Sequence, residues 1–191
     1  MPNRRDLIKS AVFGLPLLFL PTAGFAHHSS KYKNFKLDKK YEPQTVRFSG
    51  YSAGTIVVDP KNHFLYLVER WGKARRYGVG VGKAGLAFKG TAEIKRKAEW
   101  PSWTPTANMI KREPQKYKRY AKGVPGGPNN PLGARALYLY KGGRDTYYRI
   151  HGTTQPNSIG RSVSNGCIRM INDHVIDLYN RVPLGTKVVV L

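Results

Sequence analysis

The amino-acid sequence predicts a mainly β fold built around a single core. From Thr45 onward, short runs of β-forming residues alternate with Gly, Pro and Asn, which is typical of strands joined by tight turns. One segment near the C-terminus, residues 173–181, has the spacing of an amphipathic helix. With 191 residues, 40% of them hydrophobic, the chain is long and apolar enough to bury a core, which excludes a disordered basic tail.

The first strands are indicated by clusters of Val, Ile, Leu and Tyr between turn-forming residues. They are expected at residues 55–58, 64–68 and 75–81, with a turn at 59–62 between the first two. Residues 136–140 and 146–150 alternate apolar and polar side chains on either side of Gly142 and Gly143, which predicts a hairpin.

The C-terminal segment predicts one helix and a last strand. The helix at 173–181 begins after Asn172, a residue suited to cap it, and ends before Pro183. Residues 187–191 then form a closing, largely buried strand. The prediction is therefore a β domain with one or two short helices.

Residues 100–131 differ in composition from the rest of the chain. They contain six prolines among aromatic and basic residues, a pattern too broken for regular structure and too aromatic for a flexible linker. We expect a long ordered flap here. Its aromatic side chains Trp100, Trp103 and Tyr117 either line a substrate cleft or cover an edge of the core.

The N-terminus has the pattern of an export signal. Three cations are followed by an apolar run and then by small residues that end at Ala26, which predicts a cleavable signal peptide over residues 1–26. The pair Arg4-Arg5 resembles a twin-arginine signal, although Sec export remains an alternative. We therefore expect an exported protein of the periplasm or cell envelope, with residues 27–45 as an arm or linker and 46–191 as the folded domain.

The chain is strongly basic. Lys and Arg number 33 against 11 Asp and Glu, a net charge of +22, and loss of residues 1–26 would leave +20. Such a charge favours anionic partners such as nucleic acid, acidic lipid or an anionic envelope polymer, although a general solvated basic surface explains it equally well. No DNA- or RNA-binding motif accompanies the charge, so we expect no nucleic-acid partner.

A single cysteine excludes an internal disulfide and a Cys-cluster zinc site, and we expect no metal. The glycines from Gly80 to Gly85 match the spelling G-x-G-x-x-G, but the residues after them are not helical. Because a pyrophosphate site of this kind needs a helix N-terminus, we interpret the motif as a turn between strands.

The lone thiol has polar and small neighbours. Asn165-Gly166 before Cys167 favours a tight turn with exposed N–H groups that can bind an oxyanion, and a thiol nucleophile also needs a base nearby. His151, at the end of the predicted hairpin, is the candidate base. The spacing alone leaves open a catalytic Cys–His pair or a buried histidine with an inert cysteine.

The run from His151 to Met170 is more specific. It contains H-G-T, then Ile159-Gly160, then S-x-G-C-I-R-M, and resembles the active-site signature of the L,D-transpeptidase (YkuD) catalytic domain, in its ErfK/YbiS-type branch. The similarity covers residues 46–191. It implies a β-sandwich-like catalytic domain, acting without a cofactor on peptidoglycan stem peptides; we expect a monomer.

The resemblance also implies roles for the site residues. Cys167 is then the nucleophile and His151 the general base and later the acid. The N–H groups of Gly166 and Cys167 would bind the oxyanion, and a main-chain carbonyl near Gly152 would orient the imidazole, with Asp173 as a fallback. Ser164 is expected to shape the turn by bonding the backbone.

Other positions of the pattern bear on substrate binding. Many relatives have a second histidine where this chain has Asn165. Arg169 follows Cys167 by two residues and would share its face, where it could hold a substrate carboxylate; an ion pair with Asp173 or Asp177 is the alternative. Trp103 and Tyr117 are expected to contact substrate.

The activity implied is acyl transfer through a thioester, with release of D-alanine from a tetrapeptide stem. An amine acceptor would give a 3-3 crosslink or anchor an envelope protein, and water would give carboxypeptidase activity. The alternative is a catalytically silent, cationic domain that binds the cell envelope.

Overall fold

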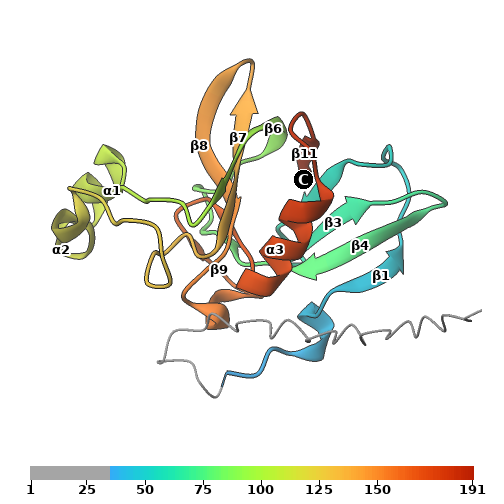
Figure 1. The fold of residues 1–191 in the computed structure, drawn as a ribbon, viewed down its shortest axis with the longest axis horizontal. Coiled ribbons are helices and arrows are strands. Elements are labelled where there is room, and N and C mark those ends of the chain that lie inside the picture. Colours follow the sequence, from blue (N-terminus) through green and yellow to red (C-terminus); the bar gives the residue numbers. More distant parts are fainter. Residues whose placement is uncertain (1–34) are drawn as a thin grey trace, which may run out of the picture.

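The strands of this computed structural model, which describes residues 35–191, form one large mixed sheet and one small sheet (Figure 1). The predicted signal peptide lies outside the described residues. The strands are β1 (Gln44–Arg47), β2 (Ile56–Asp59), β3 (Phe64–Val68), β4 (Lys73–Gly78), β5 (Val81–Gly82), β6 (Gly90–Glu99), β7 (Arg135–Lys141), β8 (Arg144–His151), β9 (Ser162–Ser164), β10 (Ile168–Arg169) and β11 (Lys187–Val190).

The large sheet has nine strands in the order β1-β4-β3-β2-β11-β6-β7-β8-β10, and β5 pairs with β9 separately. Strand β11 lies between β2 and β6, parallel to the first and antiparallel to the second. Strands β7 and β8 form the predicted hairpin, and β10 extends the sheet by pairing in parallel with β8. The prediction of a mainly β fold is confirmed.

The helices of the described residues are short. They are α1 (Ala107–Arg112), α2 (Pro114–Tyr117) and α3 (Asn172–Arg181), with 3-10 turns η2 (Lys39–Tyr41), η3 (Lys118–Tyr120) and η4 (Pro156–Ser158). Among residues 35–191, no helix has the length and apolar character needed to cross a bilayer.

Helix α3 packs across the sheet and joins its two halves (Figure 1). Val175 and Leu178 are fully buried, and burying one such side chain contributes about 1.5–3 kcal/mol. On the same helix, the Asp177 carboxylate accepts hydrogen bonds from Arg75 Nε at 2.9 Å and from Tyr77 Oη at 2.8 Å, both on β4. The helix therefore fixes strands that are distant in the sheet order.

The expected cap of this helix was wrong. The N-cap position is Ile171, and Asn172 is the first helical residue. Its Oδ1 instead accepts hydrogen bonds from the main-chain N–H groups of Ala134 and Thr153, at 3.1 and 3.2 Å. The amide satisfies buried donors of two other segments, and this tertiary contact replaces the local capping geometry.

Two strand predictions also need correction. The expected strand at 75–81 is divided, because the chain leaves the large sheet after Gly78 and forms β5 beside β9. Strand β6 was not expected from the sequence. Its charged residues do not alternate regularly with apolar ones, so the sequence shows no clear strand pattern. In the structure it lies between β11 and β7 and pairs with both.

The flap at 100–131 is ordered, but the expectation that it lacks regular structure was wrong. Thr106 caps α1 by accepting from the Met109 N–H at 3.2 Å, and Pro114 opens α2. The side chain of Asn130 donates to the carbonyls of Val124 and Pro125 at 3.0 and 2.9 Å. Prolines thus divide the segment into short helical turns. Figure 1 shows α1 and α2 at one end of the molecule, with β1 and β4 at the other.

The described part of the N-terminal arm packs on the domain more closely than expected. The Tyr41 ring lies 5.7 Å from the ring of Phe64, and a Cβ at Gly78 or Gly160 would collide with it. Strand β1 already begins at Gln44. The two glycines therefore provide the space that holds residues 39–41 against the sheet.

Candidate active site

The pairing of β10 with β8 brings the two predicted catalytic side chains into one region. Arg169 lies opposite His151, and Ile168 lies opposite Ile150. Cys167 comes directly before β10, so it lies beside Arg149, two residues along β8 from His151 and on the same face of the strand. Consistent with this register, the Cys167 sulfur accepts a hydrogen bond from the Arg149 backbone and lies 3.8 Å from the carbonyl oxygen of Tyr147.

His151 has a short main-chain contact at the Nδ1 side of its ring. Its Nδ1 lies 2.6 Å from the Gly152 carbonyl oxygen. Since a carbonyl only accepts, Nδ1 carries the hydrogen in this bond, which leaves the lone pair of the neutral ring on Nε2. The Gly152 carbonyl, and not Asp173, is therefore the group that orients the imidazole.

The surroundings of His151 favour its neutral form. The side chain is buried, with 4% exposed, and burial lowers the pKa of His151 to about 3. The positive charge of Arg169 acts in the same direction, while the carbonyls of Gly152 and Leu132 oppose it. The imidazole is therefore neutral near pH 7, with Nε2 unprotonated, and its lowered pKa makes it a weaker base than a free histidine.

Cys167 is half-buried, and burial raises the pKa of its thiol. The hydrogen bond from Arg149 and the charges of Arg149 and Arg169 lower this pKa in part. The thiol and the imidazole are thus both neutral in the resting structure, and the polar contact of the sulfur is the Tyr147 carbonyl, 3.8 Å away.

The turn before Cys167 is fixed by one hydroxyl. Ser164 Oγ accepts from the Gly166 N–H at 3.1 Å and donates to the Cys167 carbonyl at 2.6 Å. Gly166 has a φ of +123°, and a Cβ there would collide with the ring of Tyr148. Of the two expected oxyanion donors, the Gly166 N–H is therefore engaged by Ser164 in this structure.

Gly152 occupies a similarly confined position. A Cβ on it would collide with Asn172 Oδ1 and lie 3.0 Å from the Ala134 nitrogen. Its N–H donates to the Arg135 carbonyl at 3.0 Å. The absence of a side chain lets the chain after His151 approach α3, and this aims the Gly152 carbonyl at the imidazole.

Asn165 connects the turn to the flap. Its Nδ2 donates to the Tyr117 hydroxyl at 2.6 Å, and its Oδ1 accepts from Arg112 at 2.6 Å. Tyr117 is buried, and its ring packs edge-on against Trp103 with centroids 6.2 Å apart. Trp103 and Tyr117 therefore form the inner side of the flap, adjoining the residue that precedes Gly166.

Arg169 does not form the ion pair that was considered for it. Asp177 is taken by Arg75, Tyr77 and Arg181, and no salt bridge among residues 35–191 involves Arg169. Its guanidinium donates to Gln155 Oε1 at 3.1 Å and lies near enough to Cys167 and Tyr117 to interact electrostatically with both. A half-buried cation without a carboxylate partner is suited to an anionic substrate group.

Sequence reasoning missed Tyr147, an exposed residue beside the thiol. It is 71% exposed and has a φ of +61°, in the left-handed region that bulky residues avoid. It lies where the register of β7 and β8 shifts, and such bulges redirect side chains next to active sites. In the sequence, the adjacent residues Tyr147 and Tyr148 interrupt the apolar–polar alternation of the strand. This interruption is the signal from which the bulge could have been predicted.

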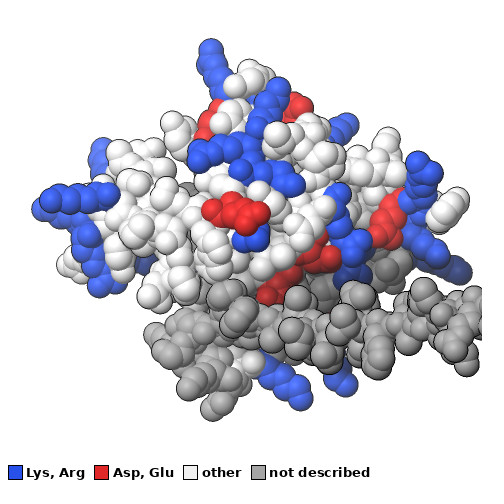
Figure 2. All heavy atoms as spheres, in the orientation of Figure 1, with Lys and Arg blue, Asp and Glu red and all other residues white. Residues whose placement is uncertain are grey.

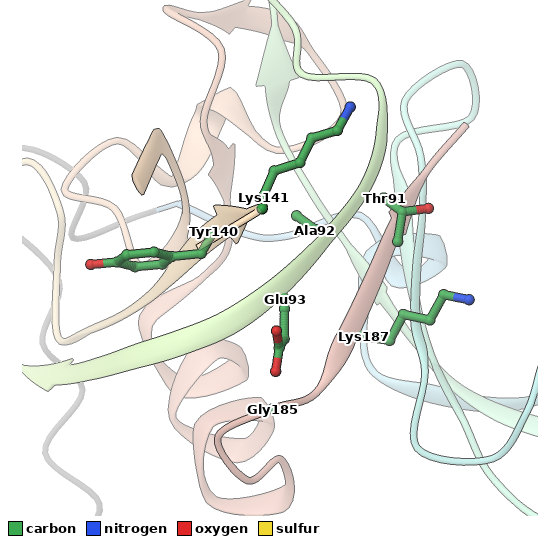
Figure 3. A pocket seen from close by; sticks show the side chains of 8 residues that line it. Thr91, Ala92, Glu93, Tyr140, Lys141, Gly185 and Lys187 are labelled. Atoms are coloured by element: carbon green, nitrogen blue, oxygen red, sulfur yellow. The ribbon is translucent and has the colours of Figure 1, made fainter. Parts of the chain in front are cut away.

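Two further sites considered for ligands do not belong to this region. A shallow pocket lined by Thr91, Glu93, Tyr140, Lys141 and Lys187 lies at the turn of the β7–β8 hairpin, at the opposite end of β8 from His151 (Figure 3). The glycine motif, Gly80 to Gly85, spans β5 and the turn that follows it, and the next element is strand β6, not a helix. In the described part of the chain, no group of three or more His, Cys, Asp or Glu is placed to hold a metal ion.

Comparison with known proteins identifies the family. Residues 53–190 match the model of the L,D-transpeptidase catalytic domain, YkuD. The chain belongs to this family. It is 34% identical over 151 residues to the probable L,D-transpeptidase ErfK/SrfK of Escherichia coli K12, which covers 78% of this chain and 46% of that protein. The chain thus spans about half the length of this curated relative.

Solved structures agree on the fold. An L,D-transpeptidase from Mycobacterium smegmatis is 19% identical, with a TM-score of 0.50, over 72% of this chain and 58% of that one. A crystal structure from Brucella melitensis, described as a probable carnitine operon oxidoreductase, is 61% identical, with a TM-score of 0.56, over 81% of this chain and 96% of that one.

Proposed function

We propose that this protein is a peptidoglycan L,D-transpeptidase that uses Cys167 as nucleophile and His151 as general base. One observation carries the proposal most directly: the parallel register of β10 and β8, which sets Arg169 opposite His151 and Cys167 two residues away on the same face. The neutral, Gly152-oriented imidazole supports the same assignment.

The first half-reaction is acylation. His151 Nε2 takes the thiol proton, and the Cys167 sulfur attacks the amide carbonyl between the third stem residue and the terminal D-alanine. A C–S bond forms and the carbonyl oxygen becomes an oxyanion, which the Cys167 N–H stabilises. When the intermediate collapses, the C–N bond breaks and His151 returns its proton to the leaving amine. D-alanine departs, and a thioester remains.

The oxyanion contact is worth a large factor in rate, since loss of one such donor typically reduces the rate about 10²- to 10³-fold. Full use of both expected donors requires that the Gly166 N–H turn from Ser164 Oγ, 3.1 Å away, to the substrate. Ser164 therefore acts as a positioning residue for the turn.

The second half-reaction is deacylation. The side-chain amine of another stem attacks the thioester, His151 takes the amine proton, and the sulfur leaves and is reprotonated. The product is a 3-3 crosslink. An envelope protein amine would be anchored in the same way, and water would give the carboxypeptidase product.

Substrate recognition is assigned to the groups around the thiol. Arg169, which has no acidic partner among the described residues, would hold a stem carboxylate. Trp103 and Tyr117 on the flap, with the exposed ring of Tyr147, would contact the rest of the stem. Export through residues 1–26 would bring the protein, as a monomer, to this polymer in the cell envelope.

The test is product analysis with purified tetrapeptide muropeptides. The protein lacking residues 1–26 should release D-alanine and form 3-3 dimers, and Cys167→Ala, similar in volume to the thiol, should form neither. Release of D-alanine without dimers would identify a carboxypeptidase. Dimers formed equally by Cys167→Ala would exclude the thiol mechanism, and no product from either protein would favour a silent envelope-binding domain.

A further inference from the structure

We propose a second binding site, for a saccharide chain whose attached peptides bear carboxylates, in the hollow at the tip of the β3–β4 hairpin. The residues that line it are Arg47, Phe48, Ser49, Trp71, Gly72 and Lys73. The proposal rests on the proposed function in one respect, namely that the ligand is the glycan part of the polymer on which the protein acts.

Trp71 is placed where a structural role does not explain it. It is 89% exposed, more than any other large hydrophobic residue of the described chain, so its indole contributes almost nothing to the core. Its φ is +59°, a left-handed conformation that Gly, Asn and Asp adopt readily and that a bulky side chain adopts at a cost in stability. Exposed aromatic rings with such a cost are typical of binding surfaces.

The surroundings of the indole leave its face accessible. Residues 70–72 close the hairpin, with Glu69 N–H bonded to the Lys73 carbonyl at 2.8 Å. The neighbouring ring of Phe48 is stacked on Tyr66, with centroids 4.3 Å apart. Phe48 is therefore already packed, and Trp71 is the aromatic wall of the hollow that is free to stack on a ligand.

The charges around the hollow select an anionic ligand. Arg47, Arg70 and Lys73 are exposed, and the nearest acid, Glu69, is half-buried. Figure 2 shows Lys and Arg gathered at this end of the molecule as well as over the flap. Cations around an aromatic face suit a sugar ring that stacks while a carboxylate of its attached peptide pairs with Arg or Lys.

A saccharide fits the site better than a bilayer does. The open wall of the hollow offers one aromatic side chain, and Ser49 and the Gly72 backbone contribute polar groups. Stable membrane attachment takes a wider apolar face or two anchoring signals, whereas one stacked ring with neighbouring polar groups suffices for a sugar.

The position of the hollow separates it from the chemistry. Arg169 of β10 pairs with Gly80, which lies seven residues after Lys73 at the start of β4, so the hollow and the thiol are roughly 20–25 Å apart at about 3.3 Å per residue. A stem peptide bound at Cys167 does not reach the hollow. A long polymer does, and binding at Trp71 would hold it near the enzyme between turnovers.

The binding experiment uses the Cys167→Ala background, in which no turnover occurs. Co-sedimentation with insoluble peptidoglycan sacculi should weaken about tenfold when Trp71→Asn is added, as for loss of one aromatic hot spot. Trp71→Tyr should recover part of the binding. Leu184→Asn, which alters another exposed hydrophobic residue, on the segment between α3 and β11 and outside the lining of the hollow, is the matched control and should bind normally. Unchanged binding by Trp71→Asn would overturn the proposal.

Folding failure does not confuse this test, because Asn suits the backbone at residue 71. We expect Trp71→Asn to raise the melting temperature by about 2–4 °C while it weakens binding. When Cys167 is kept, the Trp71→Asn variant should turn over soluble muropeptides at the same rate as the unmodified protein. It should turn over sacculi more slowly. Trp71-dependent binding to phosphatidylglycerol vesicles, without such binding to sacculi, would show that the hollow binds a membrane surface and not the glycan. Loss of turnover alone, with binding intact, would count against the proposed function and not against this site.

Discussion

Asn165 donates a 2.6 Å hydrogen bond to the hydroxyl of Tyr117, a residue 48 positions earlier in the chain. Asn165 directly precedes the Gly166-Cys167 pair, and Tyr117 ends α2 of the flap. The position of the flap and the shape of the nucleophile turn are therefore linked by one side chain, which Arg112 also binds.

Removal of this link should loosen the flap. Tyr117→Phe keeps the ring and deletes the hydroxyl, and a lost hydrogen bond of about 1 kcal/mol predicts a roughly fivefold lower kcat/KM. Hydrogen exchange of residues 107–122 should become faster. Asn165→Ala should act in the same direction and more strongly, since it also releases Arg112. A slower exchange in either variant would contradict the link.

The burial of His151 predicts a dependence of stability on pH. Its pKa is about 3 in the folded protein and 6.5 when exposed, so below pH 6.5 the unfolded chain binds a proton that the folded chain does not. Stability should fall as the pH drops from 6.5 towards 3, by at most about 1.4 kcal/mol per pH unit from this residue, and should be unaffected by it above pH 6.5. Urea unfolding at pH 7, 6 and 5 measures the slope.

The matched variant for this measurement is His151→Gln, which removes the titrating group. The difference between the two proteins isolates His151, because His174, also buried with a lowered pKa, is present in both. Parallel curves for the two proteins would show that the imidazole is not held neutral.

An accessible nucleophile at Cys167 should react with a carbapenem. Attack of the sulfur on the β-lactam carbonyl opens the ring and adds the whole molecule through a thioester, because no group leaves the protein adduct. Intact-protein mass spectrometry should show one added carbapenem mass, and Cys167→Ala should show none. Folded protein that remains unmodified would argue against an open, activated site.

Asn172 should be a major determinant of stability near the site. Its Oδ1 satisfies two buried N–H groups, and 3% of the residue is exposed. Asn172→Ala should reduce the free energy of unfolding by about 2–4 kcal/mol, since both donors lose their partner. Asn172→Asp retains the acceptor and should lose less. Equal losses in the two variants would show that the acceptor is not the stabilising feature.

The sequence predicted the elements whose patterns are local. Residues 64–68, the β7–β8 hairpin and the last strand are found within one or two positions of the expected bounds. Each has periodicity or a glycine turn of its own. Strand β6 was missed because its residues carry charges that remain at the sheet surface, and only pairing with β7 and β11 fixes its conformation.

The same distinction applies to the site. Cys167 and His151 were identified from residue type and motif, and the register of β8 with β10 is consistent with their proximity. The roles of Asn172, Gln155 and Arg112 arise from contacts between segments far apart in the chain, which no local pattern encodes. Tyr147 was not predicted because it lies within an expected strand. The bulge that exposes it depends on how β7 and β8 pair, which the sequence of β8 alone does not show.

The placement of β11 between β2 and β6 has a consequence for biosynthesis. Residues 187–190 form the middle of the large sheet, so β2 and β6 each lack one neighbour until this segment has been synthesised. A nascent chain that stops before β11 would leave two unpaired strand edges facing each other. Completion of the sheet is thereby postponed until β11 has left the ribosome.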